Sequence, residues 1–240
     1  MIGTFLNVAG ILAGSIAGLA RKTPLSAANQ NFFKIALGVL TVICGLRLTW
    51  MGLNGTVPQV LKELGIILLS LALGRMAGRL LQLQKLSNQL GQFARERMTS
   101  AQASERNRFN DGFNVCAALF CAAPLGIFGS ITDGLSVYFW PLAIKAAIDG
   151  LAAMSFVSVF GWSVMISALP VLAFQGTITL LCARFAQPFL ATHGLIDMVN
   201  ATAGLLIFAV ALLIFELKKI SVISYLPSLV FAPLLWWWLR

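Results

Sequence analysis

The chain has 240 residues, of which 59% are hydrophobic and only 10% are charged, and its mean hydropathy is +0.88. These values exclude an ordinary soluble domain and predict an integral membrane protein. The formal net charge of +9 would indicate nucleic-acid binding in a soluble protein, but here Lys and Arg lie mainly in short connections between apolar runs. That distribution follows the positive-inside rule, so we expect membrane lipid and no nucleic acid as a partner.

Three apolar runs open the chain, and we expect them to form a first membrane unit over residues 1–81. The runs cover residues 2–20, 33–53 and 60–81. In the first run glycines recur every four residues, at Gly10, Gly14 and Gly18, and form a smooth face against which another helix can pack closely. Asn7 precedes this stripe. Either it lines a binding pocket or it forms a hydrogen bond between helices, as polar side chains in spans often do.

Residues 82–111 form a long polar segment that we expect on the cytoplasmic side. Its apolar side chains recur at helical spacing, at Leu83, Leu86, Leu90, Phe93 and Ala94. This spacing predicts an amphipathic helix that lies on the inner leaflet, followed by a mobile connection.

Residues 112–162 are expected to form two central membrane helices. The first of them, residues 113–130, contains Pro124, which predicts a break in the helix. It runs outward into residues 131–134, a stretch without basic residues that we interpret as an external loop carrying Asp133.

The second central helix, residues 139–160, contains a pair of opposite charges. Lys145 and Asp149 are four residues apart, so both side chains lie on one face of a helix. Charges in an apolar span are costly unless they pair or line a wet cavity, and by default they mark a functional site. We therefore expect these two side chains to face polar groups of neighbouring helices across a hydrated space.

Three more apolar runs follow, and we expect a second membrane unit over residues 163–240. The runs cover residues 163–185, 196–217 and 222–239. Gln175, Thr177 and Thr179 add hydrogen-bonding groups to the first of these runs, and Asn200 lies near the start of the second.

Together the runs predict an all-α polytopic transmembrane helical bundle of about eight spans. The basic pairs Arg21-Lys22 and Lys218-Lys219 then fall on the inner face, which places both termini outside. Spans one to three resemble spans six to eight in pattern, and five spans separate equivalent helices. The two units would thus form an inverted repeat around the two central helices, although apolar spans rich in Leu, Ala and Gly also resemble one another by composition alone.

Polar and small residues recur at specific places in the apolar runs over nearly the whole chain. They lie in residues 1–7, 119–121, 127–130, 133–135, Lys145, 149–150, 170–172, 175–176, Thr179, 226–227 and 232–234. In these places the chain resembles the bacterial integral membrane family of unknown function that includes YqgA. The family is usually acidic where this chain has Arg79. The resemblance implies a multi-pass bacterial inner membrane protein, with both termini then periplasmic, and supplies no established substrate.

These features predict a transporter or channel for a small solute or ion. The candidate binding side chains are Asn7, Asp133, Lys145, Asp149, Gln175, Thr177, Thr179 and Asn200. In this hypothesis Asp149 binds a cation or a proton, Lys145 sets its charge state, and Asp133 guards the outer mouth.

The alternative is a membrane scaffold or assembly partner that transports nothing. Lys145 and Asp149 would then only neutralise each other, since a buried ion pair can persist without a function. The polar segment 82–111 would be the cytoplasmic handle of such a protein. The glycine stripe of the first run would suit either an internal helix contact or a homo-oligomer seam.

An enzyme is not expected. The sequence has neither His-Glu-x-x-His nor Gly-x-Ser-x-Gly, and nothing in it resembles a phosphate-binding loop. The four cysteines all lie in apolar runs and are interpreted as small buried hydrophobic residues. With a single histidine, His193, no metal site and no cofactor are predicted.

Overall fold

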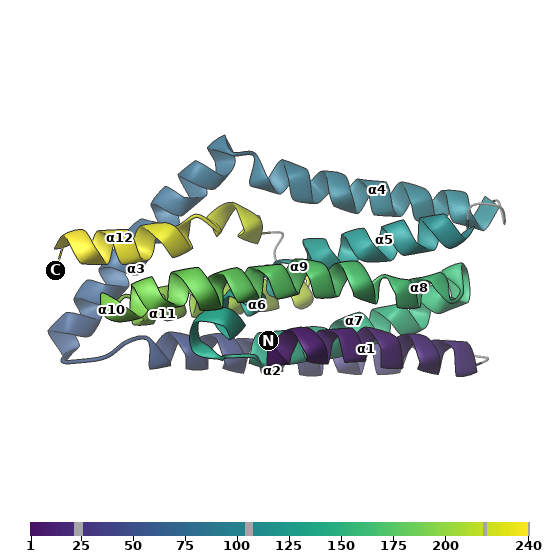
Figure 1. Ribbon diagram of the computed structural model, residues 1–240, viewed down its shortest axis with the longest axis horizontal. Coiled ribbons are helices and arrows are strands. Elements are labelled where there is room, and N and C mark those ends of the chain that lie inside the picture. The colour runs from purple at the N-terminus through teal and green to yellow at the C-terminus, as the bar shows by residue number, and fades with distance from the viewer. Residues whose placement is uncertain (22–25, 104–107, 218–219, 240) are drawn as a thin grey trace.

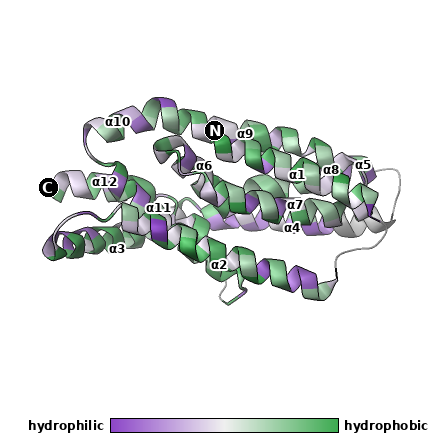
Figure 2. Ribbon diagram, turned by 90° about the horizontal axis from the view of Figure 1, so that it is seen from below, coloured by the Kyte–Doolittle hydropathy of each residue, from purple (hydrophilic) through white to green (hydrophobic). Residues whose placement is uncertain are grey.

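The computed structural model describes residues 1–21, 26–103, 108–217 and 220–239 (Figure 1). All regular secondary structure within these ranges is helical. Most helices are apolar along much of their length, whereas α4 is largely hydrophilic (Figure 2). Lys22, Lys218 and Lys219, on which the predicted orientation partly depends, lie outside the described residues.

The first unit consists of three long helices, α1 (Ile2–Ala20), α2 (Ala27–Met51) and α3 (Val57–Leu80). Ser26 caps α2, because its side-chain oxygen accepts a hydrogen bond from the Asn29 N–H. Thr56 and Gln59 form a capping box at the start of α3. All three predicted spans of this unit are therefore present as helices.

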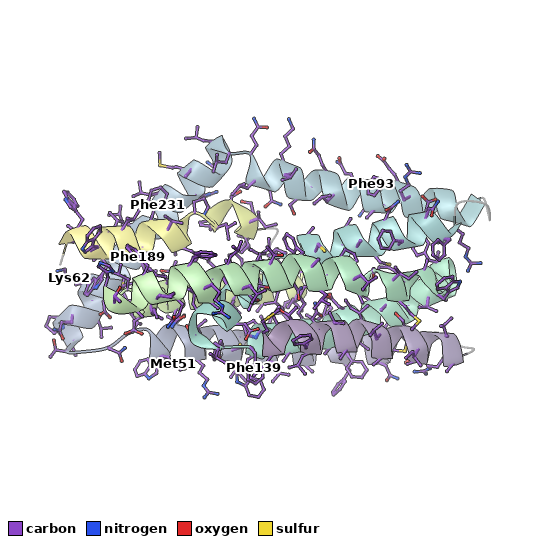
Figure 3. All side chains as sticks on the ribbon, in the orientation of Figure 1. Met51, Lys62, Phe93, Phe139, Phe189 and Phe231 are labelled. Atoms are coloured by element: carbon purple, nitrogen blue, oxygen red, sulfur yellow. The ribbon has the colours of Figure 1, made fainter. Side chains whose placement is uncertain are left out.

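Helix α4 (Leu83–Ala103) follows α3 after a bend of 60° and lies along the outside of the bundle (Figure 1). Its Ala94 is buried, whereas Leu86 and Phe93, which is labelled in Figure 3, are exposed. The predicted amphipathic helix is thus present and leaves much of its apolar face uncovered. The connection that we expected in the second part of residues 82–111 is helical wherever it is described.

Helices α5 (Arg108–Ala122) and α6 (Pro124–Ser136) are two halves of one broken segment, with a bend of 57° between them. The predicted break at Pro124 is confirmed. Proline fits here because it occupies the first turn of α6, where an N–H would have no partner within the helix.

The predicted external loop at residues 131–134 is wrong, because these residues belong to α6. The chain reverses three residues later, over 137–139, where Val137 ends α6 in the left-handed conformation with φ of 56°. Asp133 consequently projects from a helix and not from a loop.

The remaining helices complete the bundle. They are α7 (Trp140–Phe160), α8 (Ser163–Ile166), α9 (Ala168–Leu181), the π-helix η2 (Cys182–Ala186), α10 (Gln187–Thr192), α11 (Ile196–Ile214), the 3₁₀-helix η3 (Val222–Tyr225) and α12 (Ser228–Leu239). Helices α8 to α10 follow one another as a helical stretch of 30 residues. The sixth span therefore extends beyond the expected run 163–185, and Arg184 lies inside its helical stretch.

The closest contacts between neighbouring helices occur at glycines. The α1 stripe packs against the α7 backbone, where Gly10, Gly14 and Gly18 face Ala146, Gly150 and Met154 in turn. The close packing predicted for this stripe is confirmed. On the other side of the bundle α2 packs against α11, with Gly45 against Gly204.

Six of these helical segments are long and apolar enough to cross a membrane, and the number rises to eight if each bent pair is one span. Helices α1, α2, α7 and α9 run along the long axis of the molecule (Figure 1). The N-terminus lies in the middle of that length, whereas the C-terminus lies at one end (Figure 1). The predicted all-α polytopic bundle is confirmed.

Candidate functional site

Lys145 and Asp149 lie one turn apart on α7 and form an ion pair inside the bundle. Their exposed fractions are only 1% and 4%, so both charges are shielded from lipid and solvent. The Lys145 ammonium also lies 5.9 Å from the centre of the Phe120 ring of α5, a cation–π distance. A buried charge needs such partners, because desolvation of an unpaired ion costs several kcal/mol.

Two amide side chains meet the ion pair from α1 and α9. The Asn7 Nδ2 donates to the Gln175 Oε1 at 3.2 Å, and the Asn7 side chain also lies near the Asp149 carboxylate. The structure thus shows the helix-to-helix hydrogen bond that was one of the two interpretations of Asn7. Both amides are fully buried, yet the Asn7 Oδ1 and the Gln175 Nε2 have no hydrogen-bond partner. One acceptor and one donor are therefore unsatisfied inside the bundle, which is costly.

Gly126 on α6 makes room for this arrangement. A Cβ atom at Gly126 would lie 2.8 Å from the Lys145 Cε and 3.1 Å from the Gln175 Nε2. Both distances are shorter than ordinary van der Waals contacts, so the Lys145 stem and the Gln175 amide pack directly over the glycine. The Lys145 stem and the Gln175 amide therefore lie close together on the same face of α6.

Hydroxyl groups continue the polar contacts along α1, α6 and α9. The hydroxyls of Thr4 and Thr179 are 3.4 Å apart, and the Thr179 Oγ1 donates to the Ser130 carbonyl oxygen at 3.2 Å. All three residues are buried. We call the whole set the polar tract: Thr4, Asn7, Ser130, Asp133, Lys145, Asp149, Gln175 and Thr179.

Asp133 lies at one end of the polar tract. Its Oδ2 accepts a hydrogen bond from the Gly3 N–H and lies 3.2 Å from the Met1 amino group, whereas its Oδ1 has no hydrogen-bond partner. Both acidic groups of the tract thus have a cationic neighbour. Counted together with the Met1 amino group, the tract is close to electrically neutral, unlike the rings of single-sign charge that line many ion channels.

An apolar cluster covers the tract at the Asp149 end. It is formed by residues of α1, α4, α5, α7, α8 and α9, among them Ile11, Val115, Phe120, Val157 and Val164. We call it the apolar plug. The polar tract is therefore closed by packed side chains toward this end of the bundle.

Three cavities lie elsewhere in the bundle. Two of about 440 and 400 Å³ follow α2, and a third of about 320 Å³ lies between α6, α10, α11 and α12, where Phe189 is labelled in Figure 3. No residue of the polar tract lines any of these three. These three cavities are therefore separate from the polar tract.

Two predicted site residues lie apart from the tract. Thr177 is exposed, because it is two residues from Gln175 and so faces the opposite side of α9. Asn200 on α11 is buried, but its Oδ1 accepts a hydrogen bond from the Ser136 hydroxyl at 2.7 Å, one turn beyond Asp133. This hydrogen bond therefore links α11 to α6.

Sequence reasoning missed three residues of this region. Thr4 precedes Asn7 by three residues, so the helical period places both on one face and could have revealed it. Ser130 contributes through its backbone carbonyl and Gly126 through its missing side chain. Neither contribution leaves a signal in a single sequence.

The four cysteines are free, and two of them, Cys44 and Cys116, are buried. Within the described residues no group of three or more His, Cys, Asp or Glu side chains is placed to hold a metal ion.

Comparison with known proteins identifies the family of this chain. A profile described as "Protein of unknown function (DUF554)" matches residues 2–237. The chain is 27% identical over 233 residues to the uncharacterised membrane protein YdfK of Bacillus subtilis, covering 97% of this chain and 94% of the relative. It is 28% identical over 235 residues to the uncharacterised protein YqgA of Escherichia coli, again covering 97% and 94% of the two chains. No solved structure matches significantly. This chain belongs to the DUF554 family of proteins of unknown function.

Proposed function

We propose that this multi-pass membrane protein transports a small solute or ion, and that the polar tract is its binding site. The proposal depends on one observation: a buried ion pair lies beside two amides whose Oδ1 and Nε2 atoms lack partners. Buried polar groups in proteins are nearly always hydrogen-bonded, so unsatisfied ones next to intramembrane charges favour a ligand that completes them. Asp149 and Lys145 would contact the charged or polar groups of that ligand.

In this proposal the structure corresponds to a closed state. The apolar plug blocks the Asp149 end of the tract, and binding would require side chains to separate at the other end, near Asp133. The α1 and α7 pair is held by backbone contacts along its glycine stripe, so we expect it to move as one body. Alternating exposure of the two ends of the tract would then carry the solute across.

The inverted repeat remains part of the proposal, and the helix contacts support it. Equivalent helices of the two units touch one another, since α1 contacts α9, α2 contacts α11 and α3 contacts α12. A pseudo-twofold axis in the membrane plane would produce such pairs. It would also place the binding site at the interface between the units, where Asn7 and Gln175 meet.

We further propose an inner membrane location with both termini on the periplasmic side, and no enzymatic activity. The basic residues of α4 support this orientation, because an amphipathic helix with Arg95 and Arg97 fits the cytoplasmic headgroups.

Replacement of Gln175 by Met tests the proposal. Met has a similar shape and no amide, so Asn7 loses its partner while the packing over Gly126 is retained. Proteoliposomes filled with the small-molecule fraction of a bacterial lysate are incubated, and the solutes that remain inside are measured by mass spectrometry. We expect the wild type to release at least one solute faster than protein-free liposomes, and the variant to release it at least tenfold more slowly.

The control is Thr177→Val, which changes a hydroxyl on the exposed side of α9 and should leave the release unchanged. Equal release from wild-type, Gln175→Met and protein-free liposomes would contradict transport through the polar tract.

A scaffold function is the alternative, and the closed packing of the tract favours it. The exposed apolar positions of α4 and its position outside the bundle would then serve a partner or the membrane surface (Figure 1). Loss of partner recovery on deletion of residues 85–108, with flux unaffected by Asp149→Asn and Lys145→Ala together, would support the scaffold.

A further inference from the structure

A groove runs between α2 and α7 on the outside of the bundle, away from the polar tract. Two cavities of about 440 and 400 Å³ form it and meet at Leu37. From Gln30 to Arg47 it follows α2 for about 25 Å at a rise of 1.5 Å per residue. We call this the α2–α7 groove; its walls include Leu37, Ile43, Ala143, Ile144, Ala147 and Leu151.

The groove is almost entirely apolar, yet each of its ends carries a cation. At one end Lys34 lies 2.8 Å from the Glu216 carboxylate, which neutralises it. At the other end Arg47 is exposed, and no ion pair among the described residues includes it. The two ends therefore differ in charge: only the Arg47 end is left positive.

An exposed arginine near the end of an apolar span extends its side chain toward the membrane interface, where lipid phosphates are the nearest anions. Guanidinium groups bind phosphate through two parallel hydrogen bonds, and basic pockets between transmembrane helices bind lipid headgroups. Trp140 lines the same end and is about half exposed, as an aromatic residue at the membrane interface often is. The chemistry of the groove thus matches a molecule with one phosphate and a long apolar chain.

We infer that the α2–α7 groove binds a membrane phospholipid, with its phosphate on Arg47 and an acyl chain along Ile43, Ala143 and Ala147. This inference is independent of transport, because no residue of the polar tract lines the groove. The bound lipid would fill the gap between α2 and the central helix, which protein side chains leave open.

The test measures lipid binding by native mass spectrometry of the purified protein in detergent. The probes are phosphatidylglycerol and a diacylglycerol with the same acyl chains but no phosphate. Arg47→Gln should raise the dissociation constant for phosphatidylglycerol about tenfold, which corresponds to about 1.4 kcal/mol. Binding of the diacylglycerol should stay unchanged, because the acyl-chain walls are intact.

Two further variants complete the design. Lys34→Gln removes the cation whose charge Glu216 neutralises, and it should leave phosphatidylglycerol binding unchanged. Ala147→Phe places a ring in the groove from an exposed position and should weaken binding of both lipids.

Equal loss of phosphatidylglycerol in Arg47→Gln and Lys34→Gln would overturn the assignment, because it would indicate unspecific attraction to positive charge. Unchanged binding of both lipids in Ala147→Phe would also overturn the assignment. A wild-type dimer that dissociates in Ala147→Phe, with lipid binding unaltered, would show that a second copy of this chain occupies the groove.

Discussion

Replacement of Lys145 by Met is expected to lower the free energy of unfolding by about 3–5 kcal/mol, the range for removal of one partner from a buried ion pair. Met retains the apolar stem that packs over Gly126 and beside Phe120, so little packing is lost. The cost arises because the Asp149 carboxylate stays in the bundle without its counter-charge. Reversible unfolding in mixed micelles, followed by circular dichroism, measures the change.

The double variant Lys145→Met with Asp149→Asn distinguishes an effect of the ion pair on stability from an effect on transport. Asp149→Asn alone should also destabilise, because it leaves the Lys145 ammonium unpaired. Lys145→Met with Asp149→Asn removes both charges, and since neutral replacement of a buried pair is often tolerated, most of the stability should return. Transport should be lost in all three variants. If the double variant folds and transports like the wild type, the ion pair is not needed for transport and its role is only structural.

Much of the bundle could be predicted because membrane spans leave strong local signals. Apolar runs of about 20 residues predict transmembrane helices, and every predicted run is helical in the structure. The break at Pro124 and the close packing of the glycine stripe follow from properties of single residues. The contact between Lys145 and Asp149 follows from the period of the helix, which places residues four apart on one face.

The environment of these charges could not be predicted, because it depends on how helices distant in sequence pack together. Gln175 and Thr177 looked equivalent as polar residues of one span. The rotation of α9 buries Gln175 beside Asn7 and turns Thr177 outward. Asp133 was placed in an external loop because residues 131–134 contain no basic residue, whereas the left-handed turn that ends α6 comes only at Val137. Nothing local marked Gly126 as the contact surface of Lys145.

The contact between α1 and α7 determines whether Asn7 reaches Asp149, so it links the packing of the bundle to the polar tract. Gly14 lies at the centre of that contact. A Cβ atom there would overlap the Gly150 carbonyl oxygen and lie 2.6 Å from the Gly150 Cα. Backbone atoms cannot rotate away as a flexible side chain can, so the two helices would have to separate.

Gly14→Ala is therefore expected to lower the free energy of unfolding by about 1–3 kcal/mol, the usual cost of overpacking, and to reduce transport as Asn7 moves away from Asp149. The matched control is Gly65→Ala in α3, where a Cβ atom would meet nothing within 4 Å. At that position alanine should be neutral or stabilise the helix by up to about 1 kcal/mol, since glycine is the poorer helix former. The same unfolding and release assays apply to both variants. Equal stability of the two would mean that α1 and α7 are not held at the distance seen here, and the position of Asn7 relative to Asp149 would then not be fixed by this contact.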